Sequence, residues 1–262
     1  MSTLLTNMPT WLLGVIVVGG SMLLAAVGLL LARPRVKSII TEEHNDIAGF
    51  IFAAIGAVYG VLLAFLVFAV WDDFGSAQRA AAQEASTLLS LYHDTHAFPQ
   101  PIRSMTKQQL HAYAHSVVDD EWKTMEKGDP SPRTQAQLDD LYHDYGRLKP
   151  ANSWETALYA ESFTRLNDMS ADRDLRVLSS QAALADIFWV VLIGGAVLTV
   201  GFSFLFYMEN IRVQVLLTAL EAGLIALVLF LILVLNHPFT GDVRVSPESF
   251  DYALHVMAIT PP

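Results

Sequence analysis

Residues 49–71 read GFIFAAIGAVYGVLLAFLVFAVW, a run of 23 residues without a charge that ends at the acidic pair Asp72 and Asp73. At 1.5 Å per residue, a helix of this length crosses a hydrocarbon layer of ~30 Å. A helix is also the one single-segment structure that pairs all of its backbone groups inside lipid. The stretch therefore predicts a membrane span.

Small residues recur along one face of this predicted span. They stand at intervals of three or four positions, at Gly49, Ala53, Gly56, Gly60 and Ala64. Residues at this spacing share a helix face, and small side chains let a second backbone come close. Packing against another helix is the simplest interpretation of this stripe.

Aromatic residues and carboxylates give the same span a second interpretation. Tyr59, Phe65 and Phe68 stand on its other faces and are candidates to line a pore. Asp72 and Asp73 follow at its mouth, where they would form a ring of carboxylates in an oligomer and concentrate cations. The alternative for the two aspartates is a solvated helix end.

Three further apolar stretches have the length of a membrane span. They cover residues 11–32, residues 183–208, entered at Asp186, and residues 213–235. The chain of 262 residues is 53% apolar and only 16% charged, which is typical of a polytopic membrane protein rather than of a soluble enzyme. The sequence predicts an all-α fold with four transmembrane helices and an extramembrane helical domain.

The predicted spans divide the chain into four parts. Residues 1–71 hold the N-terminal tail and the first two spans, residues 72–182 form the extramembrane domain, residues 183–235 hold the last two spans, and residues 236–262 form a tail with a short amphipathic helix. The extramembrane domain carries 17 acidic and 11 basic residues, and we call it the acidic domain. The net charge of −10 argues against nucleic acid as a partner.

Helical periodicity extends through the acidic domain, with no competing strand pattern. We expect helices over residues 76–97, which continue the second span, over 102–127 and over 134–148. A long fourth helix is capped by Asn152, with Glu155 placed as in a capping box. Two helical stalks bridged by two antiparallel helices result. The amphipathic helix of the tail packs on the protein or lies at the membrane interface.

Glu221 is the only acidic residue deep in a predicted span. A carboxyl group in lipid must be neutral, paired or hydrated, so an intramembrane acid is by default a functional candidate, and Glu221 joins Tyr59, Phe65 and Phe68 as a candidate to line a pore. The alternative is a protonated side chain that hydrogen-bonds to a neighbouring helix, for instance to the hydroxyl of Thr199 or Tyr59. Both interpretations stay open.

Other charged and polar groups indicate no catalytic or metal site. His111 and His115 stand one helical turn apart, with Asp119 a further turn on, a spacing at which two imidazoles can hold one metal. No cysteine or further ligand supports this, so a polar helix face is the better interpretation. Phosphate-binding glycine loops and nucleophile elbows are also missing. We expect no metal, no cofactor and no enzyme activity.

Arg173 and Arg176 precede the third predicted span. Their charges could attract anions or lipid headgroups. Pairing with neighbouring carboxylates such as Asp172 is the simpler interpretation.

Weak motifs in a fixed order resemble the bestrophin-like membrane proteins, a domain family of unknown function, over nearly the whole chain. The motifs are His44 and Asn45, Glu84, Glu121 and Trp122, Arg173 and Arg176, and finally His237, Pro238, Phe239 and Gly241. Residues 236–242 also resemble the Asn-Pro-Phe-Gly-Glu-Asp motif of true bestrophins, with an inserted residue and no Glu after Gly241.

Bestrophins are pentameric anion channels whose second span lines a hydrophobic neck. The resemblance therefore implies a homo-oligomer, in the form of a pentamer, with residues 49–71 nearest the axis and small inorganic ions as the conducted species. It also implies cytosolic termini. By contrast, Arg33, Arg35 and Lys37 make the first loop cytoplasmic by the positive-inside rule, which places the termini and the acidic domain outside.

We expect an integral protein of a bacterial inner membrane that conducts ions passively as an oligomeric channel. The carboxylates at the pore mouth oppose anion selectivity, so the sign of the conducted ion stays open. The alternative is a non-conducting sensor or scaffold whose acidic domain binds a partner. A channel should tolerate little change at Phe65, Phe68 and Glu221, and a scaffold little change in the acidic domain. A secondary transporter ranks third, because no inverted repeat is evident.

Overall fold

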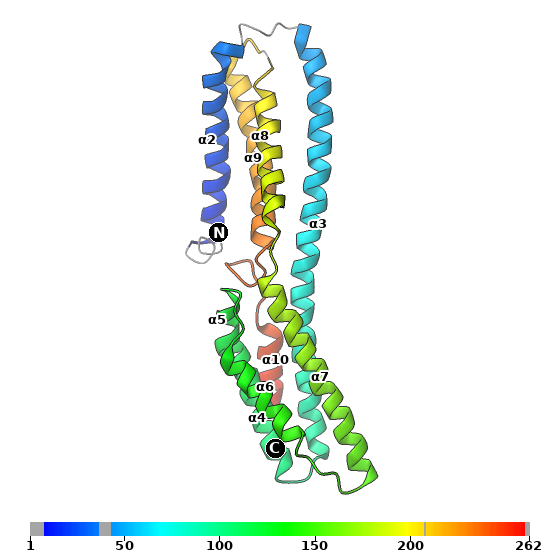
Figure 1. Cartoon of the computed structure of the whole chain (residues 1–262). Coiled ribbons are helices and arrows are strands. Elements are labelled where there is room, and N and C mark those ends of the chain that lie inside the picture. Colours follow the sequence, from blue (N-terminus) through cyan, green and yellow to red (C-terminus); the bar gives the residue numbers. More distant parts are fainter. Residues whose placement is uncertain (1–7, 37–42, 207, 260–262) are drawn as a thin grey trace. The chain divides into compact units, whose positions relative to one another are not determined.

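Helices make up most of the chain in the computed structural model, which describes residues 8–36, 43–206 and 208–259, apart from the side chains of Glu43 and His44. No strand occurs in these described ranges. Four helices are long and apolar enough to cross a membrane, namely α2 (Thr10–Val36), α3 (Glu43–Asp94), α8 (Asp186–Ser203) and α9 (Ile211–Leu235) (Figure 1). The predicted all-α fold with four spans is confirmed.

The chain forms two compact units. The membrane unit comprises Met1–Asp72, Ala183–Asn236 and Gly241–Val243, and the stalk unit comprises Asp73–Ala182, His237–Thr240 and Arg244–Pro262. α3 contributes to both units, and both draw on the C-terminal tail.

In the membrane unit, α2 packs along α9, and α8 contacts both α9 and α3 (Figure 1). Glycines permit these close approaches. A Cβ atom on Gly14 of α2 would lie 3.0 Å from the ring of Phe230, and one on Gly223 of α9 would lie 3.0 Å from Met22. A Cβ atom on Gly195 of α8 would overlap the ring of Tyr59. Each of these three glycines therefore makes room for one large side chain of a neighbouring helix.

The third span ends earlier than the apolar stretch predicts. The expected helix over residues 183–208 is α8, which ends at Ser203, and Phe204 and Leu205 form a turn. The Gln214 side chain donates a hydrogen bond of 2.7 Å to the Phe206 carbonyl, and the Ser203 hydroxyl donates to the Val200 carbonyl at 2.7 Å. Apolar composition predicts immersion in lipid, but these local hydrogen bonds decide where the helix stops.

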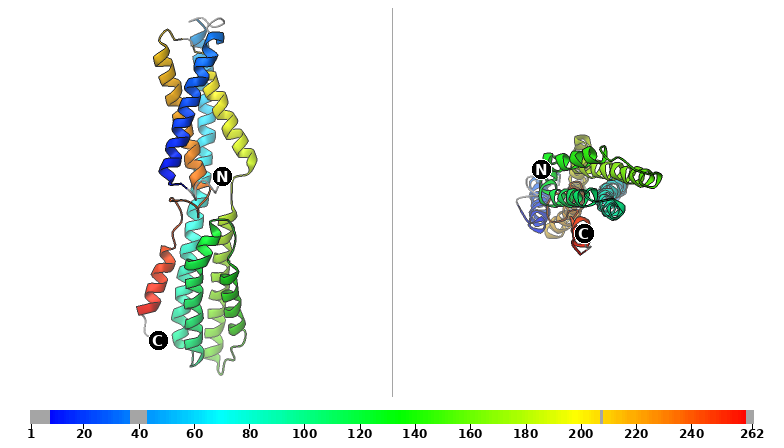
Figure 2. Two further views of the ribbon diagram at one scale, coloured as in Figure 1. Left: turned by 90° about the vertical axis from the view of Figure 1, so that its left-hand side faces the viewer. Right: turned by 90° about the horizontal axis from the view of Figure 1, so that it is seen from below.

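The stalk unit contains the rest of α3 and the helices of the acidic domain and the tail (Figure 2). These are η1 (Thr95–Ala97), α4 (Ile102–Ser116), η2 (Val117–Glu121), α5 (Trp122–Met125), α6 (Pro132–Tyr145), α7 (Ser153–Gln181) and α10 (Glu248–Ile259). α4 packs against α6, and α6 packs against α7, while α7 also contacts α3 directly through the ion pair of Arg176 with Glu84. α10 places Phe250 and Met257 in the core, so it packs on the protein.

The predicted helix over residues 102–127 is interrupted at η2, which is a π-helix. A π-helical turn holds more residues than an α-helical turn and so rotates the side chains that follow it. Glu121 at its end and the next residue, Trp122, are both buried, with exposures of 0% and 5%. The π-turn therefore brings two consecutive motif residues into the core.

Local capping explains where α6 and α7 begin. Asn152 caps α7 as predicted, since its Oδ1 accepts a hydrogen bond of 2.9 Å from the backbone N–H of Glu155. α6 begins at Pro132, two residues before the expected start, because the Ser131 hydroxyl accepts from the backbone N–H of Thr134 at 3.1 Å. Proline fits this first position of a helix, where no hydrogen-bonded N–H is needed.

Candidate functional site

One face of α3 in the membrane unit carries large apolar side chains that the described chain leaves uncovered. Phe50 is 81% exposed, and Phe65 and Phe68 are each 70% exposed. Their spacing places them on one helix face together with Asp72, which is also exposed. Asp73 is exposed on a neighbouring face. Two pore-lining candidates and one pore-mouth candidate thus share a single face of α3.

Tyr59 lies on the opposite, packed face of α3. It is only 6% exposed, and its hydroxyl donates a hydrogen bond of 2.7 Å to the Leu192 carbonyl of α8. Its ring occupies the space over Gly195. Tyr59 holds α3 against α8; it lines one groove together with Phe68, whereas Phe65 does not line that groove.

A groove of about 770 Å³ lies between α3 and α9 within the membrane unit. Gly56, Gly60 and Ala64 of the small-residue stripe line it, and a Cβ atom on either glycine would meet nothing within 4 Å. At Gly56 and Gly60, the stripe therefore does not pack against another helix of the described chain. Instead, it leaves space beside α3.

Glu221 of α9 lines this groove. Its Oε1 atom is buried and has no hydrogen-bond partner among the described residues, while the side chain also has a hydrogen-bonding contact with Ser203. The Thr199 hydroxyl donates to the Gly195 carbonyl at 2.8 Å, and the Tyr59 hydroxyl donates to α8. The hydroxyl that Glu221 contacts on the neighbouring helix α8 is therefore that of Ser203 rather than that of Thr199 or Tyr59.

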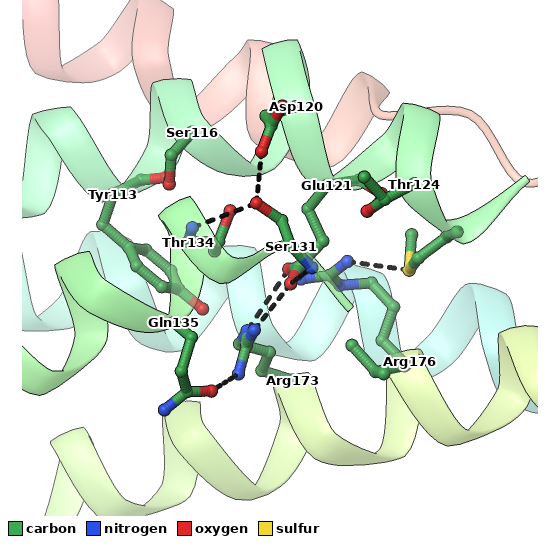
Figure 3. Close-up of polar contacts among 12 residues, drawn as sticks. Tyr113, Ser116, Asp120, Glu121, Thr124, Ser131, Thr134, Gln135, Arg173 and Arg176 are labelled. Carbon is green, nitrogen blue, oxygen red and sulfur yellow. Dashed lines mark hydrogen bonds and ion pairs between the residues drawn. The ribbon is translucent and has the colours of Figure 1, made fainter. Parts of the chain in front are cut away.

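Four charged side chains meet in the core of the stalk unit, and Figure 3 shows three of them, Glu121, Arg173 and Arg176. Arg176 of α7 donates to Glu84 of α3 at 2.6 Å and 3.0 Å and to Glu121 at 2.7 Å. Arg173 donates to Glu121 at 2.6 Å and 3.2 Å. The Tyr113 hydroxyl donates to Glu84 at 2.7 Å. We call Glu84, Glu121, Arg173 and Arg176 the charge cluster, and its two carboxylates balance its two guanidiniums.

Aromatic side chains cover this charge cluster. The guanidinium carbon of Arg176 lies 5.0 Å from the ring centre of Trp122 and 5.7 Å from that of Phe250. Trp122 also donates from Nε1 to the Val245 carbonyl at 3.1 Å and packs edge-on against Phe239. Two cation–π contacts and two ion pairs thus hold Arg176, which is fully buried.

Burial and charge shift the two cluster carboxyls in opposite directions. Burial raises the pKa of Glu84 above its ordinary value, although Arg176 and Tyr113 oppose the shift. Burial also raises the pKa of Glu121, but Arg176 and Arg173 outweigh it and hold that pKa below its ordinary value. Glu121 contacts two guanidiniums and Glu84 contacts one, which explains the difference.

The cluster corrects the expected pairing of Arg173 and Arg176. Their partners are Glu84 and Glu121 rather than Asp172, and they lie 52 to 92 positions away along the chain. No local spacing indicates such a pairing. The only signal in the sequence is the resemblance, which contains all four residues.

The remaining motif residues lie in different places. Pro238 and Phe239 are buried in the stalk unit, and His237 is half-buried. Gly241 has a φ of 81°, a backbone conformation that favours glycine. Asn45 is half-buried in the membrane unit. The side chain of His44 lies outside the described part of the chain.

The histidine pair of α4 lies at the protein surface. The ring centres of His111 and His115 are 4.7 Å apart, and Nδ1 of His115 lies 3.5 Å from Asp119 Oδ2. Within the described residues, no three histidine, cysteine, aspartate or glutamate side chains are grouped to hold a metal ion.

Four apolar helices, one of which continues from the membrane unit into a helical stalk unit, define a polytopic membrane protein with a channel-like fold. The model of the bestrophin-like domain matches residues 19–250, so the chain belongs to the bestrophin-like family. No curated protein matches the sequence.

Solved structures share the fold at low sequence identity. A variant of a bacterial bestrophin homologue from Klebsiella pneumoniae has a TM-score of 0.73 and 13% identity, over 92% of this chain and 95% of that one. Another variant of a bestrophin homologue from this organism has a TM-score of 0.70 and 14% identity, over 93% and 99% of the two chains. A structure described as a membrane protein has a TM-score of 0.70 and 13% identity, over 93% and 99%.

Proposed function

We propose that the protein is an oligomeric channel that conducts ions passively across a bacterial inner membrane. The observation that carries this proposal is the uncovered face of α3 with Phe65, Phe68 and Asp72. In a ring of identical chains, this face would line an apolar constriction with carboxylates at its mouth. The family supports the proposal, and a pentamer is the form that the resemblance to bestrophins implies.

The geometry leaves the sign of the conducted ion to measurement. Asp72 lies on the same face as Phe65 and Phe68, so a ring of Asp72 side chains would raise the local concentration of cations. The resemblance to bestrophins implies anions instead. We expect the Asp72→Asn substitution to shift the reversal potential toward that of chloride, because it removes the negative charge at the mouth.

Current through purified protein in planar bilayers under a KCl gradient tests the proposal. We expect the wild-type protein to conduct, and Phe65→Ala with Phe68→Ala to increase the conductance because the apolar constriction widens. Phe188→Ala is the matched control, since Phe188 is an exposed phenylalanine of α8 rather than of α3. If folded and inserted protein carries no current, the channel is excluded, and a membrane sensor or scaffold becomes the better proposal.

A further inference from the structure

The groove between α3 and α9 has the features of a ligand site. We propose that it binds a lipophilic amine, with the ammonium group at Glu221 and the apolar body along the groove. This inference concerns binding to the membrane unit and does not depend on ion conduction.

The size and lining of the groove fit an apolar body. Its volume of about 770 Å³ is within the range of roughly 300–1,000 Å³ that is usual for small-molecule sites. Aliphatic and aromatic side chains from both helices form its walls, among them Leu63, Val67, Phe68, Leu224, Val228 and Leu231. The space exists because Gly56 and Gly60 carry no side chain there.

The polar groups of the groove leave one carboxyl group to interact with a ligand. The hydroxyls of Tyr59 and Thr199 also border it, but both donate to backbone carbonyls of α8. Glu221 has a buried oxygen without a hydrogen-bond partner among the described residues. The contact of Glu221 with Ser203 leaves this oxygen unsatisfied, which is unfavourable, and a cation with N–H donors would relieve this.

Neither lipid tails nor a second copy of the chain would supply this cation. Acyl chains have no charge, and the apolar stretches of the four spans contain no lysine or arginine. Arg33 and Arg35 stand in the last turn of α2, and Arg212 stands in the first turn of α9. A neighbouring span could fill the groove, but it would leave Glu221 without a cation. A small lipophilic amine from the bilayer would place its apolar body against the walls of the groove and its ammonium group at the carboxyl of Glu221.

Photolabelling of the purified protein in lipid nanodiscs tests this proposal. The probe is decyldimethylamine with a diazirine on its alkyl chain, and the comparison probe is the diazirine-bearing decyl alcohol without the amine. We expect the amine to label residues of α3 and α9 that line the groove. Excess unlabelled decyldimethylamine should remove this labelling, and the alcohol should label the groove weakly.

Two pairs of variants separate a specific site from partition into the bilayer. Glu221→Gln should reduce labelling by the amine about tenfold, which corresponds to ~1.4 kcal/mol of lost binding energy. Glu209→Gln removes an exposed carboxyl that does not line the groove, and should have no effect. Gly60→Leu should fill the groove and reduce labelling, whereas Gly19→Leu adds the same side chain to an open position on α2 and should not.

Three results would overturn the proposal. Equal labelling by amine and alcohol, or labelling that survives both Glu221→Gln and Gly60→Leu, would show non-specific partition. Absence of adducts on α3 and α9 in folded protein would show that another copy of the chain fills the groove. Current measured in planar bilayers is independent of these results, so failure of the channel proposal would be recognised separately.

Discussion

The two units of this protein differ in whether their buried carboxyl groups are paired with a cation of the chain. In the stalk unit, Glu84 and Glu121 are fully buried and each accepts hydrogen bonds from at least one guanidinium. In the membrane unit, Glu221 has a buried oxygen that no described group of the chain satisfies. A carboxyl that is paired within its own chain serves the architecture. A carboxyl that has no cation within its own chain is available to bind a cation from outside the chain.

The comparison predicts that loss of one cluster partner has the largest effect on stability. Arg176→Met removes the guanidinium that contacts both carboxylates and leaves Glu84 with no cation. We expect the free energy of unfolding of the stalk unit to fall by ~3–5 kcal/mol, the range found when a buried ion pair loses one member. Urea titration of the purified protein, followed by tryptophan fluorescence, measures the change.

An exposed ion pair of the same unit supplies the control for this prediction. Arg244 Nη1 lies 2.6 Å from Glu126 Oε1, and the two side chains are 44% and 34% exposed. Arg244→Met should reduce stability by less than ~1 kcal/mol, because solvent screens such a pair. Equal losses of unfolding free energy from Arg176→Met and Arg244→Met would mean that burial adds nothing to the stability that the charge cluster provides.

The opposite pKa shifts of Glu84 and Glu121 predict opposite pH dependences of their contributions to the free energy of unfolding. We expect these effects to be smaller than that of Arg176→Met. The folded-state pKa of Glu84 is raised, so its contribution to stability is present below the ordinary value of about 4.3 and is lost as pH rises through its folded-state pKa. The pKa of Glu121 is lowered, so its contribution is present above about 4.3 and is lost as pH falls through its folded-state pKa.

Urea titrations of wild-type protein, Glu84→Gln and Glu121→Gln at several pH values measure this difference. The stability advantage of wild type over Glu84→Gln should decrease with rising pH above about 4.3, and its advantage over Glu121→Gln should decrease with falling pH below it, by about 1.4 kcal/mol per unit of pKa shift. If the stability differences of wild type from Glu84→Gln and from Glu121→Gln change with pH in the same direction, the unequal number of guanidinium contacts does not explain the pKa shifts.

The smallest effect on stability is expected at Glu221. Glu221→Gln preserves the size of the side chain and breaks no ion pair within the described chain, so the free energy of unfolding should change by less than ~1 kcal/mol. Thermal unfolding in detergent micelles measures this, with Glu84→Gln as the paired counterpart. A loss as large as that of Arg176→Met would indicate that Glu221 has a structural partner beyond Ser203, and the contrast between the two units would disappear.

Features encoded by nearby residues could be predicted from the sequence. The fourth span was expected over residues 213–235 and is Ile211–Leu235, because apolar composition reports lipid immersion directly. The Asn152 cap of α7 was predicted because its hydrogen bond reaches only three residues. Glu221 could be singled out because an acid within an apolar stretch is conspicuous.

Features that depend on distant residues could not be predicted in the same way. The partners of Arg176 come from α3 and from the π-turn, and no periodicity reveals either of them. The groove is also a tertiary feature, since Gly56 and Gly60 could equally have packed against another helix. Residue type groups Tyr59 with Phe65 and Phe68 as candidates to line a pore, whereas the partner of Tyr59 on α8 determines where its side chain lies.

The aromatic cover of the charge cluster has a consequence for biosynthesis. Phe239 and Phe250 are buried in the core of the stalk unit, yet they follow α9, the last span, along the chain. While the protein is being synthesised, the residues that form α3 to α7 emerge before these two side chains exist. The nascent stalk unit therefore keeps part of its apolar surface exposed until α8 and α9 have been made, and this interval is when we expect it to need protection from aggregation.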